Sequence, residues 1–116
     1  MQYALLIYSE ESSAEAERPT VLEEYGKLTG ELRSEGKLLA AEELQPVATA
    51  TSVQVRDGDA FVTDGPYAET KEALGGFFLI EAESLDEAID CAGRIPSARY
   101  GTIEVRPVVD HSGNAA

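Results

Sequence analysis

Basic residues are scarce in this sequence, and the shortage excludes several classes of partner. There are 9 lysines and arginines against 22 aspartates and glutamates, which gives a formal net charge of −13. Nucleic-acid affinity depends on basic residues that displace counterions from phosphates, so no nucleic-acid partner is expected. An anionic membrane surface is disfavoured for the same reason. On the simplest interpretation, the acidic surplus keeps the protein in solution.

Cysteine and long apolar runs are also scarce. Cys91 is the single cysteine, which excludes an internal disulfide, and its position within an expected helix predicts a packed side chain rather than a reactive thiol. No apolar run approaches the ~18–20 residues of a membrane span. Residues 2–8 have the pattern of a strand rather than of a secretion signal, so a cytoplasmic protein is expected.

The single histidine, His111, lies in a polar C-terminal tail, which excludes a Ser/His/Asp set. No pair of histidines or cysteines has ligand spacing, so no metal site is expected. The glycine-rich pieces match neither the G-x-G-x-x-G nor the P-loop pattern. We therefore expect a protein that works without a cofactor.

The apolar content is sufficient for one ordinary domain. The chain has 116 residues and 43% hydrophobic content, from which we assign residues 1–109 to a single domain and residues 110–116 to a flexible C-terminal tail. Residues 2–8 and 77–82 are apolar on both alternations, which is typical of inner strands covered on both faces. One sheet face is therefore expected to meet the same face of an identical chain, as a homodimer.

Two amphipathic helices are predicted, each opened by a capping box. Thr20 with Glu23 opens the first, and Ser84 with Glu87 opens the second. Gly36 stands where a left-handed C-terminal cap would end the first helix. The apolar faces consist of Val21, Tyr25, Leu28 and Leu32 in the first helix, and of Leu85, Ala88, Ile89 and Ala92 in the second.

The remaining strands complete an α+β plan. They are predicted at residues 38–44, 52–56, 60–63 and 102–108. The two middle strands form a hairpin through an Asp-Gly-Asp turn, with Val53 and Val55 expected to point inward. The order strand, helix, strand, hairpin, strand, helix, strand predicts a ferredoxin-like sandwich with an inserted β-hairpin.

The stretch from Asp64 to Gly76, DGPYAETKEALGG, is the predicted functional segment. It is longer than the about 4–6 residues of an ordinary connection, and long connections tend to be functional. Asp64 is the candidate general base, provided that the loop shields it from water. The alternative is that Asp64 caps the turn through backbone amides.

Other side chains of this segment are candidates for assisting roles. Tyr67 would donate a phenolic proton or cover the pocket, and Lys71, flanked by Glu69 and Glu72, would polarise a carbonyl group. A solvated charge cluster is the alternative for these groups. Later in the chain, Arg99 and Arg106 would hold a carboxylate or enolate ligand, unless they only form surface ion pairs with the abundant glutamates.

The segment DGPYAETKEALGGFFLIEA, together with RIPSARYGTIEVRPV after the second helix, resembles the YCII-related superfamily, in particular its DGPF (DGPFAETKE) branch. Tyr67 stands where the branch has phenylalanine. The resemblance covers most of the chain and implies a dimeric α+β barrel, in which two ferredoxin-like sheets pack face to face.

The resemblance also bears on function. Some YCII relatives look like enzymes that use a His-Asp pair, one being a dehydrochlorinase of chlorinated aromatics, and DGPF members are often found beside alternative sigma factors. The resemblance places Tyr25 where the YCII enzymes have that histidine. Any acid-base catalysis by this chain is therefore expected to use carboxylate, tyrosine or lysine side chains.

Two functions are predicted, from different classes. The first is a cofactor-free small-molecule enzyme that acts by proton transfer (isomerase, lyase or dehalogenase-like), or a ligand binder. The second is a non-catalytic interaction or accessory protein linked to a sigma-factor regulatory system, in which the 64–76 loop is a structural brace. For the first function, the expected catalytic residues are Asp64, Tyr67 and Lys71, and the expected ligand-binding residues are Tyr25, Glu69, Arg99 and Arg106.

Overall fold

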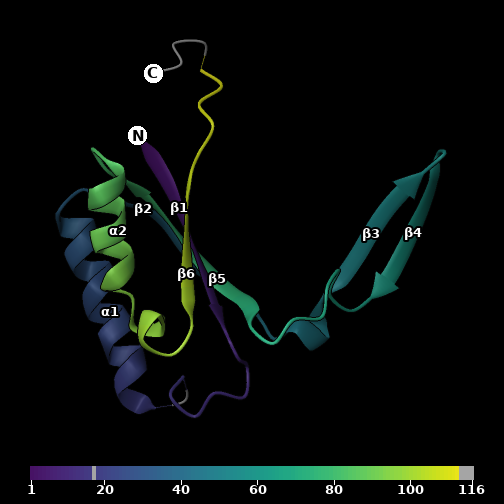
Figure 1. Ribbon diagram of the computed structural model, residues 1–116, viewed down its shortest axis with the longest axis horizontal. Coiled ribbons are helices and arrows are strands. Elements are labelled where there is room, and N and C mark those ends of the chain that lie inside the picture. The colour runs from purple at the N-terminus through teal and green to yellow at the C-terminus, as the bar shows by residue number, and fades with distance from the viewer. Residues whose placement is uncertain (17, 113–116) are drawn as a thin grey trace.

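The computed structural model describes residues 1–16 and 18–112, which form an α+β fold of the ferredoxin-like plan (Figure 1). An antiparallel four-stranded sheet has the order β2-β5-β1-β6, and a separate two-stranded sheet pairs β3 with β4. The strands are β1 (Gln2–Ser9), β2 (Leu38–Glu43), β3 (Thr51–Arg56), β4 (Asp59–Asp64), β5 (Ala73–Glu81) and β6 (Thr102–Pro107). The helices are α1 (Pro19–Ser34), α2 (Leu85–Gly93) and the short 3-10 turns η1 (Val47–Thr49) and η2 (Pro96–Arg99).

Both long helices cover the same face of the sheet. Along β1, Tyr3, Leu5 and Ile7 are buried and pack with Leu32 of α1 and Ala88 of α2 in one core. Strands bury every second residue and helices bury every third or fourth, so these apolar residues meet in a single layer. No helix among the described residues is long and apolar enough to cross a membrane.

The opposite face of the sheet is formed by the alternate side chains of the inner strands β1 and β5, those that do not point toward the helices. Leu6 pairs in register with Phe77, and Ala4 pairs with Leu79. Leu6, Phe77 and Leu79 are half-buried, although both helices lie on the other side. We call the face formed by these residues the open face.

The two helix starts differ in how well their caps were predicted. The Ser84 cap is confirmed, because the Glu87 N–H donates to Ser84 Oγ at 3.2 Å. The Thr20 cap is wrong: α1 begins at Pro19, with Arg18 as a cap that makes no side-chain hydrogen bond. Proline suits the first helical position because its φ is already helical and its missing N–H is not needed there, so the helix begins before Thr20. Gly36 ends α1 with φ 73°, as predicted.

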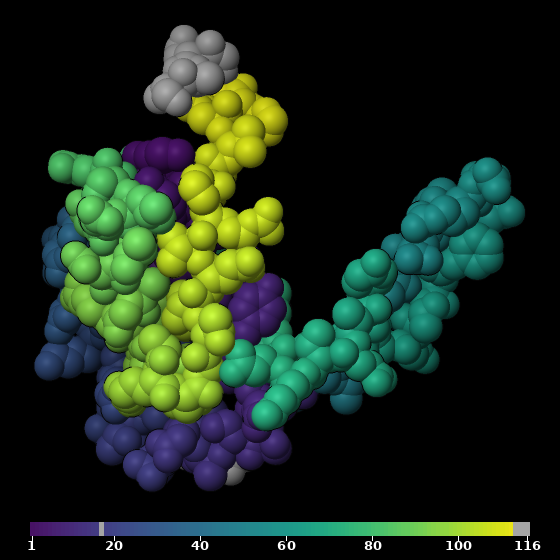
Figure 2. All heavy atoms as spheres, viewed as in Figure 1, coloured from purple at the N-terminus to yellow at the C-terminus, as the bar shows by residue number. Residues whose placement is uncertain are grey.

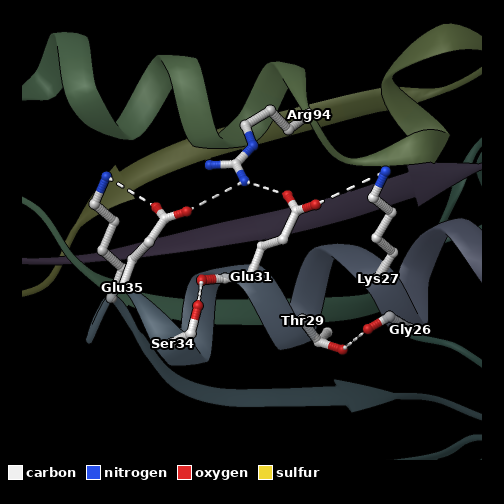
Figure 3. Close-up of polar contacts among 8 residues, drawn as sticks. Gly26, Lys27, Thr29, Glu31, Ser34, Glu35 and Arg94 are labelled. Carbon is white, nitrogen blue, oxygen red and sulfur yellow. Dashed lines mark hydrogen bonds and ion pairs between the residues drawn. The ribbon is translucent and has the colours of Figure 1, made fainter.

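Ion pairs join the C-terminal end of α1 to α2 (Figure 3). Arg94, just after α2, lies 2.8 Å from a carboxylate oxygen of Glu31 and 3.6 Å from one of Glu35. Lys37 approaches Glu35 at 3.3 Å and Glu87 at 3.6 Å. These pairs are partly exposed, so each contributes little to stability.

The strand after the predicted loop begins earlier than expected. β5 starts at Ala73 rather than at residue 77, so Gly75 and Gly76 are strand residues and not loop joints. A Cβ built on Gly76 would lie 2.6 Å from the carbonyl oxygen of Glu42 in β2. Glycine at this position therefore allows the close approach of two neighbouring strands.

The inserted hairpin is confirmed, but its predicted packing is wrong. Val53 and Val55 are 62% and 60% exposed, and Phe61 and Val62 on the partner strand are also exposed. Figures 1 and 2 show why: the hairpin leaves the body as an arm and does not lie on the chain's own core. The tail residue His111 is exposed, as predicted, and residues 113–116 of the predicted flexible tail lie outside the described part of the chain.

Candidate functional site

A cavity of about 600 Å³ lies between α1, the adjacent ends of β1, β2 and β5, and η2. Its apolar wall comes from alternating strand positions and from the inward face of α1. The buried and half-buried part of the lining, which we call the floor, carries hydroxyl groups. The residues that define this part of the cavity are Ile7, Val21, Tyr25, Phe78, Ser97 and Tyr100.

Three hydroxyl groups form a chain on this floor. The Tyr25 hydroxyl and Ser97 Oγ lie 2.5 Å apart, and Ser97 Oγ lies 3.0 Å from the Tyr100 hydroxyl. Ser97 is only 4% exposed. Each hydroxyl can donate one hydrogen bond and accept others, so the chain can reorient to meet either a donor or an acceptor. We call Tyr25, Ser97 and Tyr100 the hydroxyl chain.

Local sequence explains how Ser97 comes to this position. α2 ends at Gly93, and Pro96 opens the short turn η2, whose first position suits proline. The backbone N–H of Gly101 then donates to the Ser97 carbonyl at 2.7 Å, which closes the turn before β6. The turn therefore points Ser97 toward α1, where Tyr25 lies on the inward face.

Burial raises the pKa of Tyr25 above its ordinary value of 10.0. The hydrogen bond from Ser97 acts in the opposite direction, while Tyr100 and the nearby carboxylate of Glu43 raise the pKa further. The ring also packs edge-on against Phe78, with centroids 6.2 Å apart and an interplanar angle of 68°. Tyr25 is consequently a neutral hydroxyl at physiological pH, suited to donate a hydrogen bond rather than to act as a base.

The exposed part of the lining, which we call the mouth of the cavity, is charged. Glu11, Glu42 and Glu43 belong to its lining, together with Arg18. Glu11 is held in place because its carboxylate accepts the Val47 N–H at 2.8 Å. Arg18 is paired with Glu15 at 3.0 Å.

The predicted catalytic residues lie elsewhere. Asp64 is the exposed last residue of β4, and among the described residues its carboxylate makes no hydrogen bond or ion pair. Tyr67 is 85% exposed. Lys71 is also exposed and lies 3.4 Å from a carboxylate oxygen of Glu10. Since none of the three lines the cavity that holds Tyr25, one chain does not bring them into a common site with it, and their catalytic role stays a prediction.

The other predicted ligand residues are also dispersed. Glu69 lines a separate depression of about 420 Å³ between the loop and η1. Arg99 is ion-paired with Glu24 at 2.7 Å. Arg106 is an exposed residue of β6, on the alternation opposite to Ile103. Tyr25 alone of the predicted set reaches the cavity.

The loop itself is tied at both ends, to the base of the hairpin at one end and to β6 of the body at the other. The Ser52 hydroxyl donates to the Gly65 carbonyl at 2.8 Å, and the Gly65 N–H donates to the Ala50 carbonyl at 2.8 Å. At the other end, the Thr102 hydroxyl donates to a Glu72 carboxylate oxygen at 2.9 Å. The structural brace, which was the alternative to a catalytic loop, stays a prediction.

Ser97 and its pairing with Tyr25 were missed by sequence reasoning. Ser97 lies in the segment RIPSARY, where a serine after proline in a connection before a strand was the only local signal. Metal binding has no geometric support in residues 1–16 and 18–112, where no three His, Cys, Asp or Glu side chains cluster suitably.

An antiparallel sheet of this order with two helices on one face defines an α+β protein of the ferredoxin-like plan. The particular family follows from the sequence match: residues 1–112 match the YCII-related domain, and the chain belongs to the YCII-related family. It is 39% identical over 114 residues to an uncharacterised protein of Rhizobium meliloti, with 93% of this chain and 92% of that protein covered.

A solved structure shares the fold. It is 5-chloro-2-hydroxyhydroquinone dehydrochlorinase from Burkholderia phenoliruptrix, in complex with 2,5-dihydroxybenzoquinone. The similarity covers 100% of both chains with a TM-score of 0.55 and 15% sequence identity. At this identity the likeness establishes the common fold and nothing about the reaction.

Proposed function

We propose that this protein binds a small ring compound in the cavity at Tyr25 and transfers a proton to or from it without a cofactor. The observation that carries this proposal is the hydroxyl chain on the floor of a cavity of about 600 Å³. Sites for small molecules are commonly cavities of this size with mostly apolar walls and a few convergent polar groups.

The chemistry follows from the residues at the floor and the mouth. Glu43 lines the cavity and acts electrostatically on Tyr25, and its carboxylate takes the proton from a C–H or O–H group of the ligand. The electron pair then moves onto a ligand oxygen. The Tyr25 hydroxyl donates to that oxygen and stabilises the negative charge, with Ser97 and Tyr100 supporting the donor. Return of the proton at another position gives isomerisation, and loss of an anionic leaving group gives elimination.

The structural neighbour supports a ring compound as ligand. That protein is a dehydrochlorinase, and its structure contains 2,5-dihydroxybenzoquinone, a ring with hydroxyl and carbonyl oxygens. The hydroxyl chain of the present protein offers donors and acceptors for oxygens of that kind. The lyase-like reaction expected from the sequence belongs to the same broad class.

A thermal-shift screen of ring compounds, followed by dissociation constants for the hits, tests the site. Tyr25→Phe should weaken the hits about three- to tenfold, because one hydrogen bond is lost and the ring is kept. Tyr67→Phe is the matched control, since the same atom is removed from an exposed ring. If affinity falls in Tyr67→Phe and not in Tyr25→Phe, the functional site is the 64–76 loop, with Asp64 and Lys71 as first predicted.

We also propose that the protein is a homodimer in which two open faces pack together, as in a dimeric α+β barrel. Leu6, Phe77 and Leu79 support this, because they are half-buried apolar residues on a sheet face that no helix covers, and contiguous apolar surface of this kind commonly marks an interface. A stable interface buries about 800 Å² per partner. Sedimentation at micromolar concentration should give twice the 12.4 kDa of one chain, and a species of the monomer mass would contradict the assembly.

The second function predicted from the sequence, an accessory protein of a sigma-factor system, stays a prediction. Assignment to the DGPF branch within the family likewise depends on the motif DGPYAETKE. Recovery of a transcription factor with the tagged protein would favour the accessory role.

A further inference from the structure

The charges around the cavity are unbalanced. Its lining contains three carboxylates, those of Glu11, Glu42 and Glu43. Among the described lining residues, Arg18 is the one cation, and it is already paired with Glu15 at 3.0 Å, outside the lining. A ligand that enters the mouth therefore meets an excess of negative charge.

The cations that were expected to hold an anionic ligand do not correct this imbalance. Arg99 is paired with Glu24 at 2.7 Å and does not line the cavity. Arg106 lies on β6, with its neighbour Ala4 in register on β1, and is also outside the lining. Within one chain, no unpaired cation of the described lining is available to a carboxylate ligand.

The floor of the cavity is polar but uncharged. The Tyr25 hydroxyl, Ser97 Oγ and the Tyr100 hydroxyl satisfy one another at 2.5 and 3.0 Å. Hydroxyl groups solvate a phenol or a carbonyl well, but they do not compensate a full negative charge brought from water into a partly apolar cavity. The apolar wall from Ile7 and Phe78 makes that transfer more costly.

We infer that the cavity selects its ligand by charge: it accepts uncharged or cationic phenols and rejects the anionic analogues, and Glu43 sets this preference. The inference rests on the proposed ligand site at Tyr25. Glu43 is the best placed of the three carboxylates because it follows Ala41 on the helix-facing alternation of β2, in register with Gly76, and acts electrostatically on Tyr25.

Three probes of nearly equal shape test the preference: para-ethylphenol, tyramine and para-hydroxyphenylacetate, which are neutral, cationic and anionic. Dissociation constants are measured by ligand-observed NMR at neutral pH. The anionic probe should bind about tenfold more weakly than the neutral one, as expected for like charges several ångströms apart near a protein surface. Tyramine should bind at least as tightly as the neutral probe.

Two charge-matched variants separate the cavity from the whole protein. Glu43→Gln should bring the anionic probe closer in affinity to para-ethylphenol and should weaken tyramine relative to para-ethylphenol, whatever the change in absolute affinity. Glu83→Gln removes the same charge from an exposed position before α2, outside the cavity, and should leave the order of the probes intact. Thermal melts of both variants check that the fold is kept.

Each outcome decides a different point. Equal binding of the neutral and anionic probes by the unmodified protein would overturn the charge preference while leaving the ligand site in place. Equal effects of Glu43→Gln and Glu83→Gln would assign the preference to the net charge of −13 and overturn the role of Glu43. No binding by any probe would overturn the ligand site itself, and the inference with it.

Discussion

The Tyr25 hydroxyl and Ser97 Oγ lie 2.5 Å apart although 72 positions separate the two residues in the chain. This contact joins α1 to η2 and forms the floor of the cavity. Its energetic weight can be measured, because both groups are at least partly buried and each has a close isostere.

The first prediction concerns the coupling of these two residues. Ser97→Ala should lower the free energy of unfolding by about 1–3 kcal/mol, because two tyrosine hydroxyls lose a buried partner. Tyr25→Phe combined with Ser97→Ala should cost less than the sum of the single changes, with a coupling of about 0.5–3 kcal/mol by denaturant melts. Tyr8→Phe, which removes an exposed 3.5 Å contact to Glu104, is the control. Strict additivity would show that the contact is not energetically important.

The second prediction concerns the alkaline titration of Tyr25. Its pKa in the folded protein is raised above 10.0, chiefly by burial. The contribution of Tyr25 to stability is therefore fully present below the unfolded pKa and is lost as the pH rises through the folded one. Ring-carbon NMR of labelled tyrosine, assigned with Tyr25→Phe, should show this midpoint above 10.0. A midpoint below that value would indicate an ionised, base-like tyrosine.

The third prediction concerns the loss of folding stability at acid pH. The pKa of Glu35 is lowered by the hydrogen bond from Lys37, and Arg94 acts in the same direction. The stability from Glu35 is present above the unfolded pKa of 4.5 and is lost as the pH falls through the lower folded pKa. Glu35→Gln should flatten the pH dependence of melts in that window. Glu83→Gln, at an exposed position before α2, changes the charge equally and should preserve the slope.

The fourth prediction contrasts two glycines. Gly76→Ala should destabilise the protein by about 1–3 kcal/mol, because overpacking forces neighbouring groups apart. The new Cβ would lie 2.6 Å from the Glu42 carbonyl oxygen, which is backbone and cannot easily move. Gly30→Ala adds a Cβ within α1 with no atom within 4 Å, and should stabilise the protein by about 1 kcal/mol. Urea melts with the same sign for both substitutions would refute this account.

The fifth prediction concerns the 64–76 loop. Asp64→Ala should change stability by less than about 0.5 kcal/mol, as is usual for exposed side chains without special contacts. Ser52→Ala should cost more, because its hydroxyl donates to the Gly65 carbonyl at 2.8 Å. If Asp64→Ala is the more damaging change, the carboxylate is part of the brace and the turn-capping interpretation is correct.

The periodicity of apolar residues predicted the structure correctly where burial repeats regularly along one strand or helix. The buried alternation of Tyr3, Leu5 and Ile7 and the cap at Ser84 are of this kind, since the physical cause is local. The same rule distinguishes the two faces of the hairpin, but it does not say what covers either face. Val53 was for that reason placed inward, although the hairpin leaves the body.

The candidate site was less predictable because its parts come from distant segments. Tyr25 was selected through the family resemblance, whereas Ser97 lies in a short turn that has no repeating pattern. The cavity exists because that turn meets α1, a tertiary event with no local sequence signal. The loop was predicted as the site from its polar composition, yet Asp64, Glu69 and Lys71 are exposed and line no common cavity with Tyr25.

The backbone contact from the Leu44 N–H to the Gly75 carbonyl, at 2.8 Å, closes the whole excursion that carries η1, the hairpin and the loop. β2 and β5 pair side by side, so the segment between them is a closed loop whose two ends meet at this contact. Bringing these two ends together during folding costs loop-closure entropy, and this cost grows only slowly with the length of the enclosed segment. Replacing the excursion by a tight turn should therefore speed the pairing of β2 with β5 only modestly, and the refolding kinetics of such a shortened chain would measure this loop-closure entropy.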